Sequence, residues 1–205
     1  AETEDDVRRI LSAGQIPVLA DPRAACRAWL RPDVVVDAIL AKKNLGTAIT
    51  DAPLVIGVGP GFCAGKDCHA VIETMRGHTL GRVIRTGKPI PNTNIPGLIG
   101  GFTGERVLRA PCDGIFTAVH RIGDTVEEGE TIGFVEGQPM KCTISGVLRG
   151  VLDDGVPVKK GMKSGDVDPR CKPEYCTTIS DKALAVGGGV VEAVLYLSAK
   201  AQGRR

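Results

Sequence analysis

The chain has 205 residues and a mass of 21.5 kDa, enough for one full domain or two small ones, each with its own core. Charged residues make up 24% and hydrophobic residues 42%, which is ordinary for a globular protein and excludes extended disorder. The net charge is only +2 and aromatic residues are 3%, so the basic surface and stacking rings that hold nucleic acids are missing. We therefore expect no nucleic-acid partner.

Cysteine usage and hydropathy indicate the compartment. Seven cysteines, an odd number, fit reduced thiols in the cytoplasm better than a disulfide framework. The most apolar run, Ala183 to Leu197, is interrupted by three glycines and by Glu192, so it falls short of a membrane span. The sequence predicts a cytoplasmic protein with no membrane partner.

The first third of the chain alternates between helix and strand signals. Thr3 can cap a helix over Glu4–Leu11, and Ile16–Leu19 has the pattern of a short strand. Asp21 and Pro22 then favour a helix from Ala24 to Leu30, because proline costs nothing at the first helical position. This alternation is typical of an α/β sheet.

Two buried strands are predicted next, at Val34–Val36 and Pro53–Val58. Continuous β-branched runs of this kind are buried on both faces of a parallel sheet. The pattern starts with a helix and has no opening strand, so we expect an incomplete Rossmann-like sheet whose first βαβ portion is missing. This α/β portion is assigned to residues 1–104, including a Pro- and Gly-rich linker over Lys88–Gly104.

An internal repeat follows the linker. Five positions recur with an offset of 32 residues, Gly114, Gly123, Val126, Gly129 and Gly133 matching Gly146, Gly155, Val158, Gly161 and Gly165. Each copy predicts strand, turn, short strand, turn and strand, and each can cover the apolar face that the other leaves open. We expect an all-β barrel-sandwich hybrid, as in biotinyl and lipoyl domains, over residues 105–168.

The remaining residues, 169–205, are assigned to a C-terminal segment and a helix that packs on the first portion. Ser180 and Asp181 form a good helix cap. Gly187–Gly189 weaken a lone helix by about 1 kcal/mol each, so they predict either a break or close backbone packing.

A glycine-rich loop after the Pro53–Val58 strand is the first candidate site. Gly59, Gly61 and Gly65 let backbone amides approach an anion, as phosphate-binding loops do. The spacing is one residue longer than the dinucleotide fingerprint, and a plain turn at a strand end is the alternative.

Charged and polar side chains surround this loop in the sequence. A carboxylate, an imidazole and cations close together can bind an anion and move a proton, whereas a surface ion-pair loop is the plainer interpretation. Wound sheets place ligand contacts beyond the carboxyl ends of their strands. The candidate residues besides the glycines are Lys42, Lys43, Asn44, Glu73, Arg76, His78 and Arg82.

Two alternative functions stay open. The first is a metal site, with Cys63, Cys68 and His69 as candidate ligands. Zinc sites usually have the tighter CxxC spacing, so buried thiols without a metal are the plainer interpretation. Lys141, beside Met140, suggests a biotin- or lipoyl-carrying lysine, but it lies where a strand is expected and not in the turn at Glu136–Gln138. The candidate ligand set therefore includes no metal ligands.

Several long motifs together resemble the selenium-dependent molybdenum hydroxylase system proteins, the YqeB-type family. The resemblance covers essentially the whole chain and rests on VVVDAILAKKNLGT, GPGFCAGKDCHAVIETMRGHTLGRVI, NIPGLIGGFTGERVLRAPCDG, GDTVEEGETIGFVEG, GDVDPR and ISDKALAVGGGVVEA. Family members typically begin with a Gly-rich Rossmann-type segment, which this chain lacks. The resemblance implies no family-wide role for the thiols of Cys63, Cys68 and Cys142.

The resemblance implies an accessory or maturation factor for selenium-dependent molybdenum hydroxylases, not the hydroxylase itself. The expected partners are the hydroxylase or its maturation machinery and a small anionic or nucleotide-like ligand at Gly59–Gly65. The sequence leaves open whether the chain forms a homo-oligomer. The sequence does not decide the cofactor, the ligand or whether the chain is an enzyme.

Overall fold

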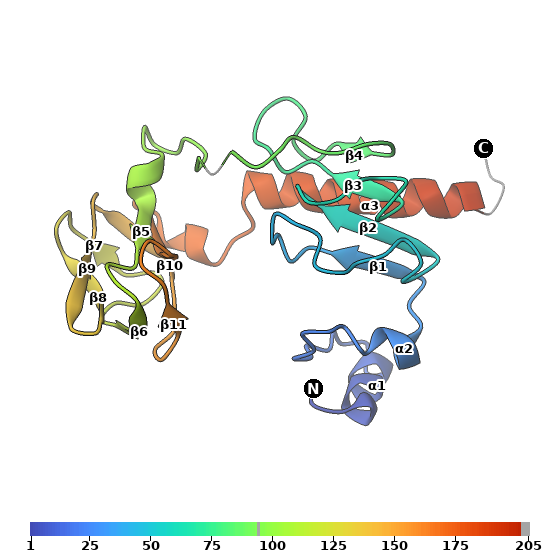
Figure 1. Cartoon of the computed structure of the whole chain (residues 1–205), viewed down its shortest axis with the longest axis horizontal. Coiled ribbons are helices and arrows are strands. Elements are labelled where there is room, and N and C mark those ends of the chain that lie inside the picture. Colours follow the sequence, from blue (N-terminus) through green and yellow to red (C-terminus); the bar gives the residue numbers. More distant parts are fainter. Residues whose placement is uncertain (94, 202–205) are drawn as a thin grey trace. The chain divides into compact units, whose positions relative to one another are not determined.

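Two compact units divide the chain in the computed structural model, which describes residues 1–93 and 95–201. Unit 1 comprises Ala1–Asn92 together with the chain from Ala185 onward, and unit 2 comprises Thr93–Leu184. Figure 1 shows both units.

The N-terminal segment is less regular than the sequence predicts. Helix α1 spans Glu4–Ser12, and the Thr3 hydroxyl accepts a hydrogen bond from the Asp6 amide at 3.2 Å, which confirms the predicted cap. Helix α2 is confined to Arg27–Leu30, because Ala24 has a φ of 48° and cannot belong to a helix. The strand predicted at Ile16–Leu19 is wrong: this segment pairs with no strand, and Ile16 is 91% exposed.

A four-stranded sheet forms the centre of unit 1. Its order is β1 (Val34–Asp37), β2 (Leu54–Val58), β3 (Ala70–Ile72) and β4 (Val83–Ile84). The first three strands are parallel and β4 is antiparallel to β3. The structure confirms the two predicted strands; the Rossmann-like assignment stays a prediction.

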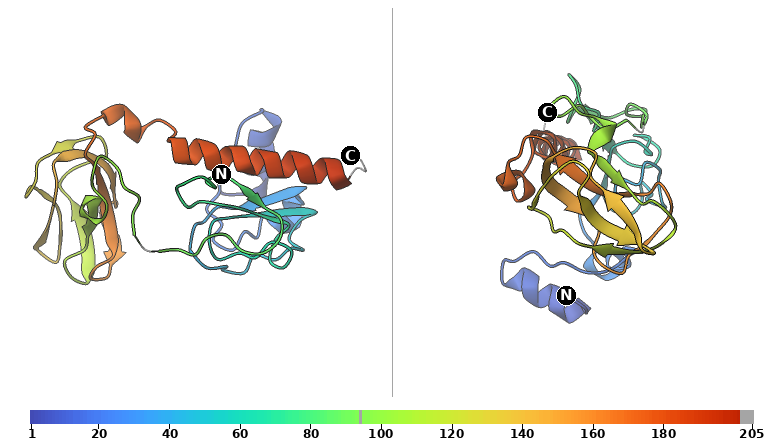
Figure 2. Two further views of the ribbon diagram at one scale, coloured as in Figure 1. Left: turned by 90° about the horizontal axis from the view of Figure 1, so that it is seen from above. Right: turned by 90° about the vertical axis from the view of Figure 1, so that its left-hand side faces the viewer.

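Helix α3 (Asp181–Ala201) covers one face of this sheet (Figures 1 and 2). Its inner side chains pack on β2 and β3; they are Val186, Val190, Ala193, Val194 and Leu197. The helix runs unbroken through Gly187–Gly189. Close packing is therefore the correct alternative: a Cβ on Gly189 would lie only 2.1 Å from the Gly81 carbonyl oxygen.

By length and composition alone, the stretch Pro173–Ala199 is apolar enough to cross a membrane. This is weak evidence, because the core helix of a soluble protein passes the same test. The absence of a membrane partner stays a prediction.

Unit 2 consists of two four-stranded sheets around one core. The first has the order β5 (Val107–Arg109), β12 (Lys163–Asp168), β10 (Gly146–Val151) and β7 (Thr125–Val126). The second has the order β11 (Pro157–Val158), β6 (Gly114–Ala118), β8 (Thr131–Val135) and β9 (Gln138–Lys141). Two 3-10 helices, η1 (Gly104–Arg106) and η2 (Pro173–Cys176), flank the strands.

The 32-residue repeat is the organising element of this unit. Strands β6, β7 and β8 of the first copy correspond to β10, β11 and β12 of the second. The copies exchange strands: Gly146 pairs with Val126, and Gly114 pairs with Val158. Each sheet thus contains strands from both copies, as expected if neither can cover its own apolar face. The barrel-sandwich assignment stays a prediction.

Equivalent residues of the two copies meet in the core. Phe116 and Leu148, both 0% exposed, are one such pair, and Val126 and Val158 are another. Burial of each large apolar side chain contributes about 1.5–3 kcal/mol, so this shared core is the main stabilising feature of unit 2.

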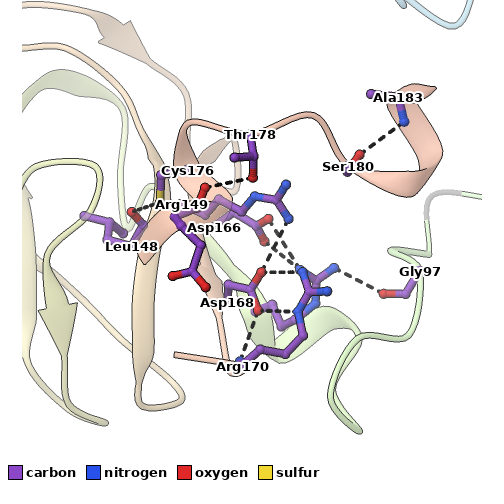
Figure 3. A network of polar contacts seen from close by, with 12 residues as sticks. Gly97, Leu148, Arg149, Asp166, Asp168, Arg170, Cys176, Thr178, Ser180 and Ala183 are labelled. Carbon is purple, nitrogen blue, oxygen red and sulfur yellow. Dashed lines mark hydrogen bonds and ion pairs between the residues drawn. The ribbon is translucent and has the colours of Figure 1, made fainter. Parts of the chain in front are cut away.

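An arginine–aspartate network holds both ends of unit 2 against β10 and β12 (Figure 3). Arg106 pairs with Asp166 at 3.4 Å and donates to the Gly97 carbonyl at 3.1 Å. Asp168, which is buried, accepts two side-chain hydrogen bonds from Arg170, at 2.6 and 2.9 Å. Residues 97–106 and 169–176 are thereby grouped with unit 2.

Candidate functional site

Most candidate residues of the sequence lie in loops at one edge of the unit 1 sheet; Gly65 is the exception, because its amide donates to the Cys68 carbonyl just before β3. Strands β1, β2 and β3 are parallel, so their carboxyl ends meet at that edge. The loop with Lys42 and Lys43 follows β1, the Gly59–Gly65 loop follows β2, and the loop with Glu73 follows β3. We call this edge the carboxyl edge. It is where open α/β sheets bind ligands.

Close contacts join these three loops. A Cβ on Gly61 would lie 2.7 Å from the backbone of Lys43, and a Cβ on Gly59 would lie 2.9 Å from the Thr74 hydroxyl oxygen. Both glycines also have a positive φ, 83° at Gly59 and 115° at Gly61, so no other residue fits there without strain. The glycines therefore serve loop packing as well as backbone conformation.

The loop after β1 is held in an unusual conformation. Leu40 and Lys42 have φ angles of 60° and 65°, in the left-handed region that non-glycine residues rarely adopt. The side chains of Lys42 and Lys43 are exposed. Two cations thus stand at the carboxyl edge on a backbone that its surroundings hold in place.

Most backbone amides of the glycine-rich loop already donate hydrogen bonds to other residues of the chain. The amides of Gly59, Cys63, Ala64 and Gly65 donate to Ile72, Asp67, Gly87 and Cys68, at 2.8 to 2.9 Å. Within the described residues, Gly61 and Phe62 are left as the loop amides that donate to no acceptor. The predicted cradle of amides is therefore reduced to two donors.

Buried hydrophobic contacts fix the loop on the face of the sheet opposite α3. Phe62 is 4% exposed and packs in a cluster with Val55 and Val71. A Cβ on Gly57 would lie 2.6 Å from the Phe62 ring, so the strand glycine makes room for it. The loop is anchored at its centre by an aromatic side chain.

Glu73 does not face the ligand side as the sequence suggested. Its carboxylate is buried and accepts hydrogen bonds from the amides of Met75 at 2.7 Å and Ile90 at 2.9 Å. Its backbone also pairs with Gly81 and Arg82. A buried carboxylate with two amide donors is satisfied, so Glu73 supports the loop and is a poor proton relay.

The side chain of Asn44 also forms its hydrogen bonds within its own loop. Its side-chain oxygen accepts from the amides of Gly46 and Thr47, and its amide nitrogen donates to the Thr47 carbonyl, all at 2.8 Å. Arg76, His78 and Arg82 have exposed side chains. Asn44 shapes the site, whereas these three exposed side chains remain as candidate ligand groups.

Two further residues lie at the carboxyl edge and were not among the candidates predicted from the sequence. Asp37, the last residue of β1, is buried and accepts from the Thr47 hydroxyl at 2.5 Å and the Ile39 amide at 3.1 Å. Thr74 is buried against Gly59. Their positions, at or just after the end of a parallel strand, are the signal that could have identified them.

The cysteine and histidine candidates do not form a metal site. Burial raises the pKa of the Cys68 thiol to about 11, and His69 accepts a hydrogen bond from the Val55 amide at 3.0 Å. Within residues 1–93 and 95–201, no three His, Cys, Asp or Glu side chains are grouped to hold a metal ion. The described residues thus give the metal alternative no ligand set.

Lys141 lies at the end of strand β9. The hairpin turn between β8 and β9 is formed by Glu136 and Gly137, with φ angles of 47° and 77°. These angles are typical of a tight two-residue turn. The lysine is therefore displaced from the turn where a carrier domain would present it.

An open cavity of about 510 Å³ lies at the opposite edge of the sheet. It is lined by residues that precede β1 and β2, among them Arg27, Arg31 and Asp51. Burial pushes the pKa of Asp51 up, but hydrogen bonds from the Ala48 amide and Arg27 outweigh this effect and leave the pKa below its ordinary value. The cavity is separate from the carboxyl edge.

Comparison with known proteins identifies one curated relative. The chain is 48% identical over 197 residues to the uncharacterized protein YqeB of Escherichia coli. The chain is a relative of YqeB. The match covers 96% of this chain but 36% of YqeB, so the chain spans about a third of its relative's length. No protein-family model matches.

Solved structures resemble the chain only weakly. An aspartoacylase family protein from Mesorhizobium loti has a TM-score of 0.30 and 14% identity, covering 40% of this chain and 27% of that one. A succinylglutamate desuccinylase/aspartoacylase from Rhodobacter sphaeroides has a TM-score of 0.28 and 27% identity, covering 31% and 21%. Similarity at this level supports no inference about function.

Proposed function

We propose that the chain belongs to an accessory or maturation factor for selenium-dependent molybdenum hydroxylases, and that its carboxyl edge binds an anionic or nucleotide-like ligand. The relation to YqeB and the long motifs described above support the first part. The convergence of three loops beyond parallel strands, at Lys43, Gly61 and Thr74, carries the second. A cytoplasmic location belongs to the proposal and is supported by seven free cysteines.

The residues that contact the ligand in this proposal are fewer than the sequence suggests. The amides of Gly61 and Phe62 donate to an anionic oxygen, and the ammonium groups of Lys42 and Lys43 provide the charge. The Arg82 guanidinium, exposed just before β4, adds a second cationic element from the adjacent loop. Glu73, Asn44 and Asp37 hold the loops in place.

Calorimetry tests the binding step. We expect the full-length protein to bind one member of a panel of nucleotides and pterin phosphates, and Lys43→Ala to weaken binding by about 1.5–3 kcal/mol, the scale of a charge-assisted hydrogen bond. Lys160→Ala, an exposed lysine of unit 2, is the matched control and should leave binding unchanged. No binding by full-length wild type at millimolar ligand would reject the ligand site.

A cellular comparison tests the maturation role. Cells without the full-length gene should produce hydroxylase with lower activity and lower selenium content than cells that carry it. Complementation with Gly61→Val should fail, because the side chain would collide with the Lys43 backbone, whereas Gly65→Ala, where a Cβ has nothing within 4 Å, should be milder. Equal selenium content with and without the gene would refute the role.

A further inference from the structure

The open cavity at the edge of the unit 1 sheet opposite the carboxyl edge has no part in the proposed function. Its walls come from two segments that each precede a parallel strand, residues 27–32 before β1 and residues 50–53 before β2. We call it the amino-edge cavity. Its volume of about 510 Å³ lies within the range of pockets that hold small molecules.

One arginine of the amino-edge cavity is compensated within the chain. The Arg27 guanidinium forms an ion pair with the Asp51 carboxylate, which also accepts a hydrogen bond from the Ala48 amide at 2.9 Å. The Arg27 Nε atom donates to the Ala24 carbonyl oxygen at 3.0 Å. These contacts cancel the charge of Arg27 and fix its side chain as one wall of the cavity.

The second arginine, Arg31, has no such partner. Its side chain is exposed, and among residues 1–93 and 95–201 no group forms an ion pair or a hydrogen bond with its guanidinium. Two arginines and one aspartate line the cavity, so one positive charge is left over, and it lies on Arg31. The cavity therefore offers an uncompensated cation to a ligand.

The backbone at Arg31 is in a conformation that a side chain disfavours. Arg31 directly follows helix α2 and has a φ of 47° and a ψ of 60°, in the left-handed region. Glycine is the usual residue at this position of a helix end, because it has no Cβ. Folding stability alone favours glycine at position 31, whereas an anionic ligand in the cavity accounts for arginine.

The remaining walls are apolar, apart from one hydroxyl group. Pro32, Ala52 and Pro53 line the cavity with carbon atoms. The Thr50 hydroxyl forms no hydrogen bond within the part of the chain that the structure describes. A cation and a hydroxyl beside an apolar wall suit an anion that carries an apolar body.

We propose that the amino-edge cavity binds a small organic monocarboxylate. The planar guanidinium of Arg31 can donate to both carboxylate oxygens at once, and Pro32 and Pro53 contact the apolar body of the ligand. The single uncompensated charge balances a monocarboxylate, whereas a phosphomonoester brings nearly two negative charges. The proposal does not depend on ligand binding at the carboxyl edge.

Titration of the whole chain with cyclohexanecarboxylate tests the proposal. Trp29, the single tryptophan of the chain, lies in α2 between Arg27 and Arg31, so its fluorescence reports on the cavity. We expect a saturable change in this fluorescence and NMR shifts of the Arg31 and Ala52 amides. Cyclohexanecarboxamide has the same shape without the charge and should bind at least about tenfold more weakly.

Variants at Arg31 separate ligand binding from folding. Arg31→Gly should bind cyclohexanecarboxylate at least about tenfold more weakly. Its urea midpoint should equal or exceed that of wild type, because glycine suits the left-handed backbone. Arg31→Gln, which removes the charge but keeps a long side chain, should weaken binding to the same extent. Arg23→Ala, an exposed arginine of the same segment outside the cavity, is the matched control and should bind as wild type does.

Four outcomes overturn the proposal. The first is a wild type that shows neither signal at about 50 mM cyclohexanecarboxylate, well above a millimolar dissociation constant. The second is equal affinity for the acid and its amide, and the third is tighter binding of cyclohexyl phosphate than of the carboxylate. The fourth is an Arg23→Ala variant that loses as much affinity as the two Arg31 variants.

Discussion

Adjacent glycines of helix α3 should respond in opposite directions to the same substitution. Gly188 is exposed, and a Cβ there has nothing within 4 Å. Gly189 is buried, and a Cβ there would lie 2.1 Å from the Gly81 oxygen and 3.0 Å from the Ile72 side chain. Alanine at the two positions thus isolates close packing from helix propensity.

The expected magnitudes follow from two opposing effects. Replacing a mid-helix glycine by alanine stabilises a helix by about 1 kcal/mol, so Gly188→Ala should raise the free energy of unfolding by about that amount. Gly189→Ala gains the same propensity but forces α3 away from a backbone oxygen. Overpacking costs up to about 3 kcal/mol, which leaves a net loss of about 2 kcal/mol.

Urea unfolding followed by far-ultraviolet circular dichroism measures the difference. Helix α3 has 21 residues against 9 in α1 and 4 in α2, so the helical signal reports mainly on α3. The two variants should be separated by about 3 kcal/mol at an unchanged denaturant slope. If Gly189→Ala proves as stable as Gly188→Ala, the close contact between α3 and Gly81 is refuted.

Three further predictions concern burial and ionisation. Phe116→Ala should destabilise unit 2 by about 3–5 kcal/mol in thermal unfolding, because the ring is 0% exposed; a loss below about 1 kcal/mol would contradict the shared core. Hydrogen bonds from Arg170 hold the pKa of Asp168 below its ordinary value, so its stabilising effect is complete above about pH 4 and is lost as the pH falls through the lower folded pKa. Asp168→Asn should therefore flatten the acid side of the stability profile, and an unchanged profile would disprove the pairing. Burial raises the pKa of Cys68 to about 11, so iodoacetamide at pH 8 should alkylate exposed Cys171 first, and peptide mass mapping that finds Cys68 modified first would disagree.

Short-range and periodic signals account for the parts of the fold that the sequence predicts. The glycines of the repeat mark turns at fixed spacing, and Val34–Val36 is a continuous β-branched run, so both patterns are local. The Ile16–Leu19 strand is wrong because a strand needs a neighbour with which to pair, and nothing in its own four residues encodes one. Likewise, the 24–30 helix is shortened by the backbone conformation of Ala24.

The candidate site was predictable in position but not in detail. Residues that follow parallel strands must gather at one edge, which is why Lys43 and Gly61 meet although they are far apart in the sequence. Hydrogen-bond partners depend on tertiary contacts. The sequence therefore could not show that Glu73 satisfies the Met75 and Ile90 amides, or that Asn44 is used within its own loop.

The exchange of strands between the two repeats also constrains how unit 2 emerges from the ribosome. Strand β12 pairs with β5 and β10, and β11 pairs with β6. A nascent chain that ends after the first repeat has β6 and β8 but lacks the strands that complete either sheet. Unit 2 must therefore wait until residue 168 has been synthesised and then form its non-local pairs in one late, cooperative step.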